Sequence, residues 1–450
     1  MVARGDRLSD LPETILLHIL SMVKDAKQVV RTSIPSTQWR FLWRSVSLSL
    51  KFTFSDSQNL NNTLDYLAST HTQLYYCEKI MKFSVWRFRY EERFAKHVDL
   101  WLHFATKASN LQELTLGLFP INEDQNYDFP QFAFKNGHTK LTDAAMEKVL
   151  SDCPNLECLE LESNSGIHRL ENSSLKMRLL LIEDCYNNDH DILLEILGSH
   201  IQHLKILGLC GEIRIAQKNV PSLVTTIFRL NFNFEDQEDN DLEKEFSYLK
   251  ELLHSVVHVE NLELGTWCTK CLSILELKGL NSPPSSLKFL ELNLAVEQLD
   301  FPGIYSFLRS SSDLERLVIC CWYNHEARDL LLRYTNEDEQ TRRFEMYNVN
   351  CSFSHLETIK IDNFCGPLSE NKYVLQLVKY LLKHATMLEE FVIATVTLQD
   401  TSPDYDKLTQ EVLSFPISSS HASYDFLAPI VLGNPFLHHP SFCLISVVSL

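Results

Sequence analysis

The chain has 450 residues, of which 45% are hydrophobic and 22% charged, so it is long and apolar enough to bury a sizeable core. Its 59 acidic and 41 basic residues give a formal net charge of −18. A surface of this sign repels phosphate backbones, and no compact basic run compensates for it. Nucleic acid is therefore excluded as an expected partner.

The first residues do not resemble a signal peptide, and no stretch reaches the roughly 20 apolar residues that a helix needs to cross a bilayer. We therefore expect no membrane partner. The 12 cysteines are irregularly spaced, which is typical of reduced thiols in a protein of the cytosol or nucleus.

The first predicted element is an amphipathic helix in residues 11–23, LPETILLHILSMV, for which Ser9 or Asp10 is the expected cap. At 100° per residue, its apolar side chains cover an arc of roughly 160°. A surface helix usually buries only about 100° of its circumference. This helix is therefore expected to contact other elements on two sides.

A second amphipathic helix is predicted where Trp39, Leu42, Trp43 and Val46 follow helical spacing. Together the first forty-odd residues carry more apolar surface than they can bury among themselves. Segments of this size seldom fold alone without a metal, a disulfide or a partner, and no suitable Cys or His lies here. The sequence therefore predicts a partner protein.

The segments LPETILLHILSMV, VVRTS and QWRFLWRSV, in this order, resemble the F-box, especially its plant type. The resemblance covers roughly residues 6–50. It implies a three-helix domain that docks on the Skp-type adaptor of an SCF (Skp–cullin–F-box) ubiquitin ligase and, through that adaptor, reaches cullin. Carried over by position, the adaptor-binding residues would be Leu11, Pro12, Ile15, Leu16, Ile19, Leu20, Val30 and Trp39.

One part of this segment departs from the F-box pattern. Where the family usually has a hydrophobe-Ser-Lys-Arg-Trp run, the chain has PSTQW, with Pro35 and Gln38 at altered positions. A proline inside a helix removes a backbone donor and costs about 3 kcal/mol, whereas at a helix start it is tolerated. Two alternatives therefore stay open: a degenerate F-box that enters no ligase, and helices that only cap the following domain.

The spacing L-x-x-L-x-L recurs along most of the remaining chain. Each copy predicts a short strand with one buried face, and such strands can bury each other only when they are stacked. Helical patterns lie between copies, as in residues 141–155 and 373–387. Clear copies begin at Leu111, Leu156, Met177, Leu204, Val259, Leu272, Leu287, Leu314, Leu356 and Leu388, a further one at Ile80 and a poor one at Leu223.

This pattern resembles leucine-rich repeats (LRRs), and residues 355–393 resemble the FBD module that follows LRRs in many plant F-box proteins. The expected fold class is α/β: an N-terminal three-helix F-box followed by an irregular LRR solenoid, with parallel strands inside and helices outside. The expected domains are an F-box at 1–50, a linker at 51–75, LRRs at 76–345, an FBD-like C-terminal repeat or cap at 346–412 and an irregular tail at 413–450.

The sequence offers little for catalysis. It lacks the phosphate-binding, dinucleotide-binding, nucleophile-elbow and zinc-protease motifs, so we expect no enzyme activity, no catalytic residue, no cofactor and no metal. Cys268 and Cys271 resemble a thioredoxin-type pair, which needs a helix start to activate its thiol. Their expected place in a repeat turn leaves little room for such a helix, so a redox enzyme is the least favoured alternative.

Acidic residues outnumber basic ones among the strand positions predicted to face the inner surface of the solenoid. Such a wall would steer and select a basic target protein. The other reading is that Glu is simply common on solvated strands of an acidic protein, and both readings stay open. The residues expected to bind the target are Glu160, Glu162, Glu263, Glu276 and Glu291.

The resemblance implies the substrate-recognition subunit of an SCF ubiquitin ligase, resident in the nucleus, the cytoplasm or both. Its F-box would hold the adaptor, and its LRR surface would hold an unidentified target protein. The alternative is an LRR interaction scaffold whose F-box does not enter a ligase.

Overall fold

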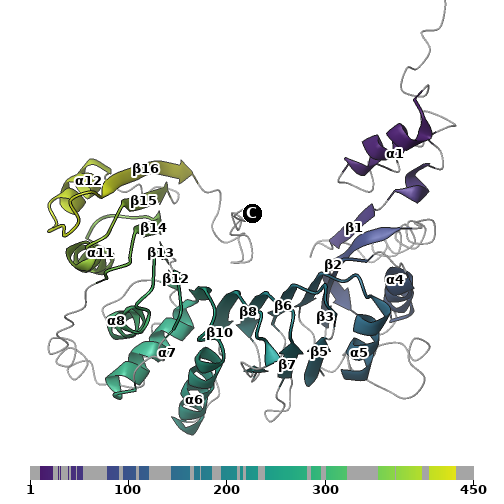
Figure 1. The fold of residues 1–450 in the computed structure, drawn as a ribbon, viewed down its shortest axis with the longest axis horizontal. Coiled ribbons are helices and arrows are strands. Elements are labelled where there is room, and N and C mark those ends of the chain that lie inside the picture. The colour runs from purple at the N-terminus through teal and green to yellow at the C-terminus, as the bar shows by residue number, and fades with distance from the viewer. Residues whose placement is uncertain are drawn as a thin grey trace, which may run out of the picture. The chain divides into compact units, whose positions relative to one another are not determined.

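The chain divides into two units in the computed structural model: unit 1, residues 1–223 with 231–233, and unit 2, residues 224–230 with 234–450. Each is built on parallel strands (Figure 1). The structure describes residues 11–23, 29, 31, 39, 42–46, 48–53, 79–90, 95–107, 111–120, 143–162, 167–172, 174–184, 194–209, 213–215, 219–231, 239–280, 285–294, 300–321, 353–369, 371–397 and 405–431.

Unit 1 begins with helix α1 (Glu13–Ser21) and the short 3-10 helix η1 (Leu42–Ser45), which pack together. Pro12 is the N-cap residue of α1 and no side chain caps the helix, so the expected cap at Ser9 or Asp10 was wrong. Pro12 is tolerated here because a helix start needs no N–H from it. Most of the middle of the predicted three-helix F-box, including Val30, lies outside the described residues.

The main sheet of unit 1 consists of parallel neighbours in the order β1-β2-β3-β4-β6-β8. Helices α4 (Ala95–Lys107) and α5 (Asp143–Asp152) belong to its second layer, which continues as a small parallel sheet, β5-β7-β9. The main strands are β1 (Leu48–Thr53), β2 (Ile80–Tyr90), β3 (Glu113–Pro120), β4 (Cys158–Glu162), β6 (Leu179–Glu183) and β8 (His203–Leu209); the small ones are β5 (Arg169–Asn172), β7 (Leu194–Gly198) and β9 (Ile213–Ile215).

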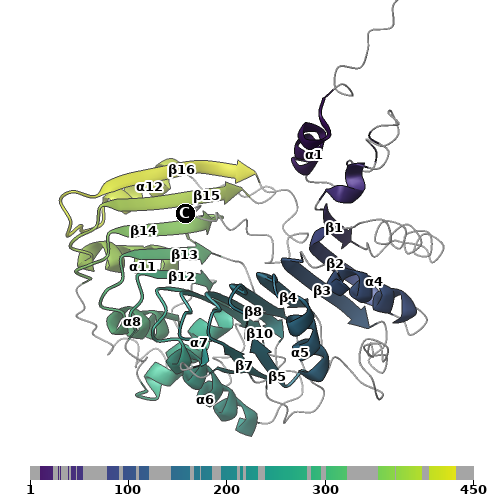
Figure 2. The ribbon, with the colours of Figure 1, turned by 45° about the vertical axis from the view of Figure 1, so that its right-hand side comes forward.

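Unit 2 has parallel strands in the order β10-β11-β12-β13-β14-β15-β16, with its helices on one side of the sheet (Figures 1 and 2). None of the described helices is long and apolar enough to cross a membrane. The strands are β10 (Thr225–Asn231), β11 (Asn261–Leu264), β12 (Phe289–Leu294), β13 (Arg316–Cys321), β14 (Thr358–Phe364), β15 (Glu390–Thr397) and β16 (Ser423–Val431). The helices are α6 (Asp239–Ser255), α7 (Thr266–Leu277), α8 (Phe301–Ser310), α11 (Lys372–His384) and α12 (Tyr405–Leu413).

The repeat spacing explains the core of unit 2. Leu262, Leu290 and Leu317 pair in register on adjacent strands, and all three are buried beneath the helices. Residues between such core positions point to the opposite, inner face because side chains alternate along a strand. The expected α/β class, with parallel strands inside and helices outside, is confirmed.

One predicted repeat is not a strand. The copy beginning at Leu272 forms the second half of helix α7, which starts after Gly265. A parallel strand must be reached by a crossover of roughly a dozen residues or more, and β11 ends at Leu264, too close to allow one. The segment therefore becomes the crossover itself, with Leu272 and Leu275 in the buried face of a helix.

Two other repeats were assigned imperfectly. On β8 the buried set is Ile201, Leu204 and Ile206, so this copy begins three residues before the predicted start at Leu204. The poor copy at Leu223 is a genuine strand, β10, in which the buried Thr226 takes a position usually held by leucine.

The ends of the predicted domains also differ in the structure. Strand β1 crosses the expected boundary between the F-box and the linker at residue 50. The expectation of an irregular tail over 413–450 was wrong at 423–431, which form β16. At the positions that pair with the buried Phe391 and Ile393, this strand has the half-buried Tyr424 and Phe426 in place of leucine, which is why the repeat spacing did not reveal it.

Candidate protein-interaction surfaces

Helix α1 has two apolar faces with different surroundings. Leu16 and Leu20 are fully buried, whereas Ile15 is 45% exposed. Of the other predicted adaptor-binding residues, Pro12 is exposed, Leu11 and Ile19 are half-buried and Trp39 is buried. The structure therefore separates the predicted set into side chains that hold α1 in place and side chains that remain available.

The available face forms a short apolar stripe. Ile15, Ile19 and Met22 lie at positions i, i+4 and i+7, which bring side chains to one side of a helix. Met22, just after α1, is 69% exposed. Sequence reasoning placed Met22 in the apolar arc but left it out of the predicted contact set. An apolar stripe of this kind is suited to packing against a helix or groove of another protein.

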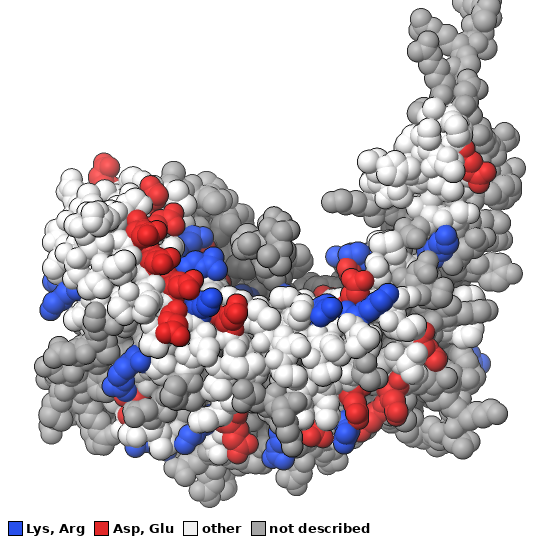
Figure 3. Space-filling model, in the orientation of Figure 1, with Lys and Arg blue, Asp and Glu red and all other residues white. Residues whose placement is uncertain are grey.

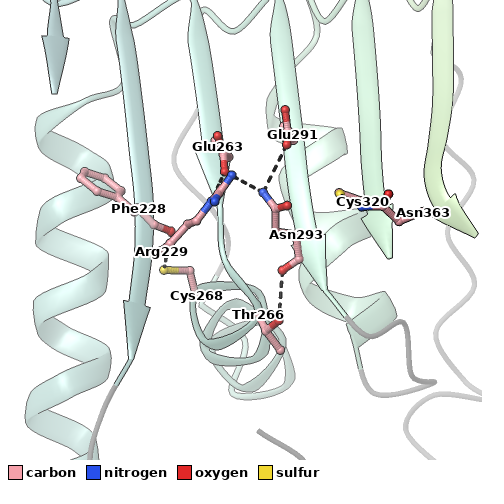
Figure 4. A network of polar contacts seen from close by, with 9 residues as sticks. All are labelled: Phe228, Arg229, Glu263, Thr266, Cys268, Glu291, Asn293, Cys320 and Asn363. Carbon is pink, nitrogen blue, oxygen red and sulfur yellow. Dashed lines mark hydrogen bonds and ion pairs between the residues drawn. The ribbon is translucent and has the colours of Figure 1, made fainter. Parts of the chain in front are cut away.

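The inner face of unit 2 carries a polar network around Glu263. Its carboxylate is ion-paired with Arg229 and accepts a hydrogen bond of 2.7 Å from the Asn293 amide (Figure 4). The same amide lies 3.3 Å from the carboxylate of Glu291, and Thr266 donates to the Asn293 carbonyl at 3.0 Å. These contacts tie three adjacent strands to the start of α7.

This network changes the role of the predicted acidic wall in unit 2. Glu263 and Glu291 do lie side by side in register on β11 and β12, as expected for inner-face positions. However, the side chain of Glu263 is only 10% exposed and its charge is matched by Arg229. Glu263 therefore stabilises the sheet more than it attracts a distant partner.

The remaining predicted target-binding residues lie in different places. Glu160 and Glu162 are on β4 in unit 1, where Glu160 accepts a hydrogen bond of 2.7 Å from Thr115 and Glu162 is 8% exposed. The prediction for Glu276 was wrong, because this residue belongs to helix α7 and not to an inner strand. Its buried carboxylate pairs with Arg309 of α8 at 2.8 Å.

The Cys268–Cys271 pair lies in helix α7, not in the expected repeat turn. Both thiols are fully buried, and the Cys268 thiol lies 3.5 Å from the carbonyl oxygen of Phe228, to which it donates. Burial raises the pKa of the Cys268 thiol to about 12, so the reactive thiolate is suppressed. This environment does not support redox exchange. Among the described residues, no group of His, Cys, Asp and Glu is placed to hold a metal ion.

Comparisons with known proteins agree with these features. The FBD family model matches residues 348–393, which include β14, α11 and the start of β15. A putative F-box/LRR-repeat protein of Arabidopsis thaliana is 26% identical over 421 residues, covering 86% of each chain. An FBD-associated F-box protein from the same plant is 27% identical over 455 residues, covering 92% of this chain and 94% of the relative. A further Arabidopsis F-box/LRR-repeat protein is 26% identical, covering 70% of each chain.

Proposed function

Because this chain is a plant F-box/LRR-repeat protein with an FBD, we propose that it is the target-recognition subunit of an SCF-type ubiquitin ligase. In this role α1 binds a Skp-type adaptor, and the inner sheet faces bind a target protein. We propose that it acts in the nucleus, in the cytoplasm or in both. The single observation that carries the proposal is the exposed apolar stripe of α1.

The stripe supports adaptor binding because the packing of α1 within the chain does not account for these apolar side chains. Leu16 and Leu20 are fully buried and α1 packs on the neighbouring 3-10 helix, whereas Ile15 and Met22 are exposed and Ile19 is half-buried. Exposing them to water is unfavourable at about 25 cal/mol per Å² of apolar surface. A partner that covers them gains this free energy on binding.

The proposed contribution to ubiquitin transfer is positional. The chain would hold a target near a charged ubiquitin carrier, which raises the effective concentration of the target's lysines at the carrier. Bond formation and cleavage would occur on other subunits. The buried thiols of α7 are consistent with this division of labour, since they offer no nucleophile at the surface.

The decisive experiment uses the full-length chain with Ile15→Asp and Ile19→Asp combined. Thr14→Asp with His18→Asp is the matched control, since it places the same charges, four residues apart, at other exposed positions of α1. We expect the first variant to lose a plant Skp-type adaptor in co-purification by at least about tenfold and the control to retain it. Equal retention by both variants contradicts the proposed docking face.

The departure at Pro35 and Gln38 favours one second candidate, an LRR scaffold that enters no ligase. These residues lie outside the described part of the chain. Adaptor binding by the unmodified chain, measured beside an F-box protein known to be functional, separates the two candidates. If the functional F-box protein binds the adaptor and this chain does not, the result favours the scaffold.

A further inference from the structure

Four acidic residues of unit 2 lie at the starts of adjacent strands. We call Glu315, Glu357, Glu389 and Glu390, which precede or begin β13, β14 and β15, the acidic rim. The Glu357 amide donates to the Glu315 carbonyl at 2.8 Å, and the Glu389 amide donates to the Glu357 carbonyl at 2.8 Å. Glu315, Glu357 and Glu389 therefore occupy equivalent positions on consecutive strands, and Glu390 is one residue further along β15, opposite Thr358. Figure 3 shows a run of acidic side chains over this part of unit 2.

This arrangement is electrostatically unfavourable within the chain. Neighbouring strands lie about 4.8 Å apart, and like charges directly opposite each other are destabilising. Glu315 has Lys288 at 4.0 Å, but Glu357, Glu389 and Glu390 are exposed and make no ion pair within the part of the chain that the structure describes. A cationic partner would relieve repulsion that the fold itself leaves in place.

The sheet face beside the rim is partly apolar. Val318, Val392 and Leu427 point to the inner face, where Leu427 is 48% exposed, Val318 is half-buried and Val392 is buried. Asp425 pairs in register with Val392 and is exposed as well, so the row across β13 to β16 reads Val318, Lys360, Val392 and Asp425. The described helices lie on the other side of these strands and leave the face uncovered (Figure 1).

The basic side chains of the same face are already engaged. Lys360 is ion-paired with Asp362 at 2.8 Å. The Arg316 guanidinium lies over the ring of Phe289, 5.4 Å from its centroid, in a cation–π contact. Among the described residues, neither group forms an ion pair with Glu357, Glu389 or Glu390.

We propose that the inner face of β13 to β16, with its acidic rim, binds a segment of the target protein in which Lys or Arg residues alternate with aliphatic ones. The inference rests on the proposed function of target recognition and names the chemistry of the target. The acidic rim would attract the basic groups, while Leu427 and the half-buried Val318 would contact the aliphatic ones. A nucleic acid does not fit, because the rim repels its phosphates.

This location differs from the five glutamates that the sequence singled out for target binding. Charge complementarity favours carboxylates that are exposed and unmatched, because their field reaches an approaching partner. Glu263 and Glu276 are matched by Arg229 and Arg309, respectively. The rim residues Glu357, Glu389 and Glu390 are exposed and are not ion-paired among the described residues.

The test uses the full-length chain in complex with the adaptor and a fluorescent peptide with Lys at every second position and Val or Ser between. A matched peptide has Glu in place of Lys. We expect fluorescence anisotropy to show binding of the Lys peptide alone. Combining Glu357→Gln, Glu389→Gln and Glu390→Gln should weaken that binding about tenfold. Leu427→Ser should weaken it as well, through the apolar contact.

A second triple variant controls for net charge. Glu251→Gln, Asp406→Asn and Glu411→Gln remove the same number of charges from exposed positions of α6 and α12. This variant should bind the Lys peptide like the unmodified chain. Equal weakening by both triple variants, or no binding of the Lys peptide at all, overturns the proposal. Adaptor binding is measured in the same samples and tests the proposed ligase role independently of the peptide. Thermal unfolding checks that each variant is folded.

Discussion

Lys270 of α7 and Asp300 at the start of α8 form an ion pair inside the helical layer of unit 2. Their Nζ and Oδ1 atoms are 3.2 Å apart, and the two side chains are 2% and 0% exposed. Next to them, Ser273 donates to the Asp300 carbonyl at 3.0 Å and accepts a hydrogen bond of 2.9 Å from the Gly303 amide. The contact between α7 and α8 is therefore specified by polar groups as well as by apolar packing.

Removing one partner of this ion pair should be strongly destabilising. Lys270→Met leaves the Asp300 carboxylate buried without its cation, at an expected cost of about 3–5 kcal/mol. Combining Lys270→Met with Asp300→Asn should recover a substantial part of this loss because no buried charge remains. Urea unfolding of both variants measures the difference, and an unchanged midpoint for Lys270→Met would show that the pair is not needed.

The close approach of α8 to α7 should make Gly303 intolerant of a side chain. A Cβ atom at this position would lie 2.6 Å from the Ser273 backbone nitrogen and 2.7 Å from the Thr269 carbonyl oxygen. Since backbone atoms cannot move aside cheaply, Gly303→Ala should destabilise by about 1–3 kcal/mol. Gly279→Asn is the control, because Gly279 has open space and a φ of +80° that asparagine tolerates. Equal melting temperatures of the two variants would contradict the expected crowding.

Stability should fall at alkaline pH. Burial raises the pKa of Cys268 and of Cys321 from 9.0 to about 12 in the folded chain. Between these values the unfolded chain has lost protons that the folded chain keeps, so rising pH favours unfolding. The urea midpoint should therefore drop as pH rises from about 9 towards 12. Cys268→Ala should reduce the pH dependence, and a midpoint that rises with pH would contradict the argument.

The edge of the small sheet in unit 1 should depend on Asp143. Its Oδ1 accepts hydrogen bonds from the backbone amides of His168 and Arg169, at 2.6 and 2.9 Å, so that a side chain of α5 pairs with the edge of β5. Asp143→Ala leaves both amides without this acceptor. Hydrogen exchange at the two amides should accelerate about tenfold or more, whereas exchange in β12 of unit 2 should not change. Unchanged exchange at His168 and Arg169 would show that other groups protect this edge.

The two faces of α1 should respond oppositely to truncation. Leu16→Ala creates a cavity in a fully buried position and should cost about 2–5 kcal/mol of stability. Ile15→Ala removes a side chain that is 45% exposed and should cost less than about 1 kcal/mol while weakening adaptor binding. Thermal unfolding and adaptor titration, measured on both variants, separate packing from docking. A larger stability loss for Ile15→Ala would reverse the assignment of the faces.

The core strands could be predicted from the sequence because one spacing specifies both the strand and its buried face. Leu262, Leu290 and Leu317 illustrate this, since each is the second apolar residue of its repeat and all three pair in register. The spacing is ambiguous where apolar residues are dense. Near β8, copies starting at Ile201 and at Leu204 both fit, and pairing with β6 selects the former.

The repeat at Leu272 shows where spacing fails. Leu272, Leu275 and Leu277 satisfy the strand pattern, but Leu272 and Leu275 also suit one side of a helix, and chain connectivity decides between the two. The short distance from the end of β11 contained this information, since a parallel strand needs a crossover first. For this segment, the number of residues between repeats predicts the secondary structure better than the L-x-x-L-x-L spacing does.

The candidate sites were less predictable because they depend on partners that are distant in sequence. Arg229 precedes Glu263 by 34 residues and lies in the poor repeat, so nothing local to Glu263 indicated that its charge is matched. The acidic rim was missed for a related reason. Its residues become neighbours only when strands stack in register, and the positions around Glu357 and Glu389 were read as repeat starts with no shared surface.

The strand order of unit 2 has a consequence for synthesis. From β10 to β16, spatial order follows chain order, so every strand emerging from the ribosome finds its preceding neighbour already made. No strand has to wait for one translated later, which shortens the time during which an unpaired edge is open to aggregation. A stalled or truncated chain would therefore still be able to assemble the strands it had completed.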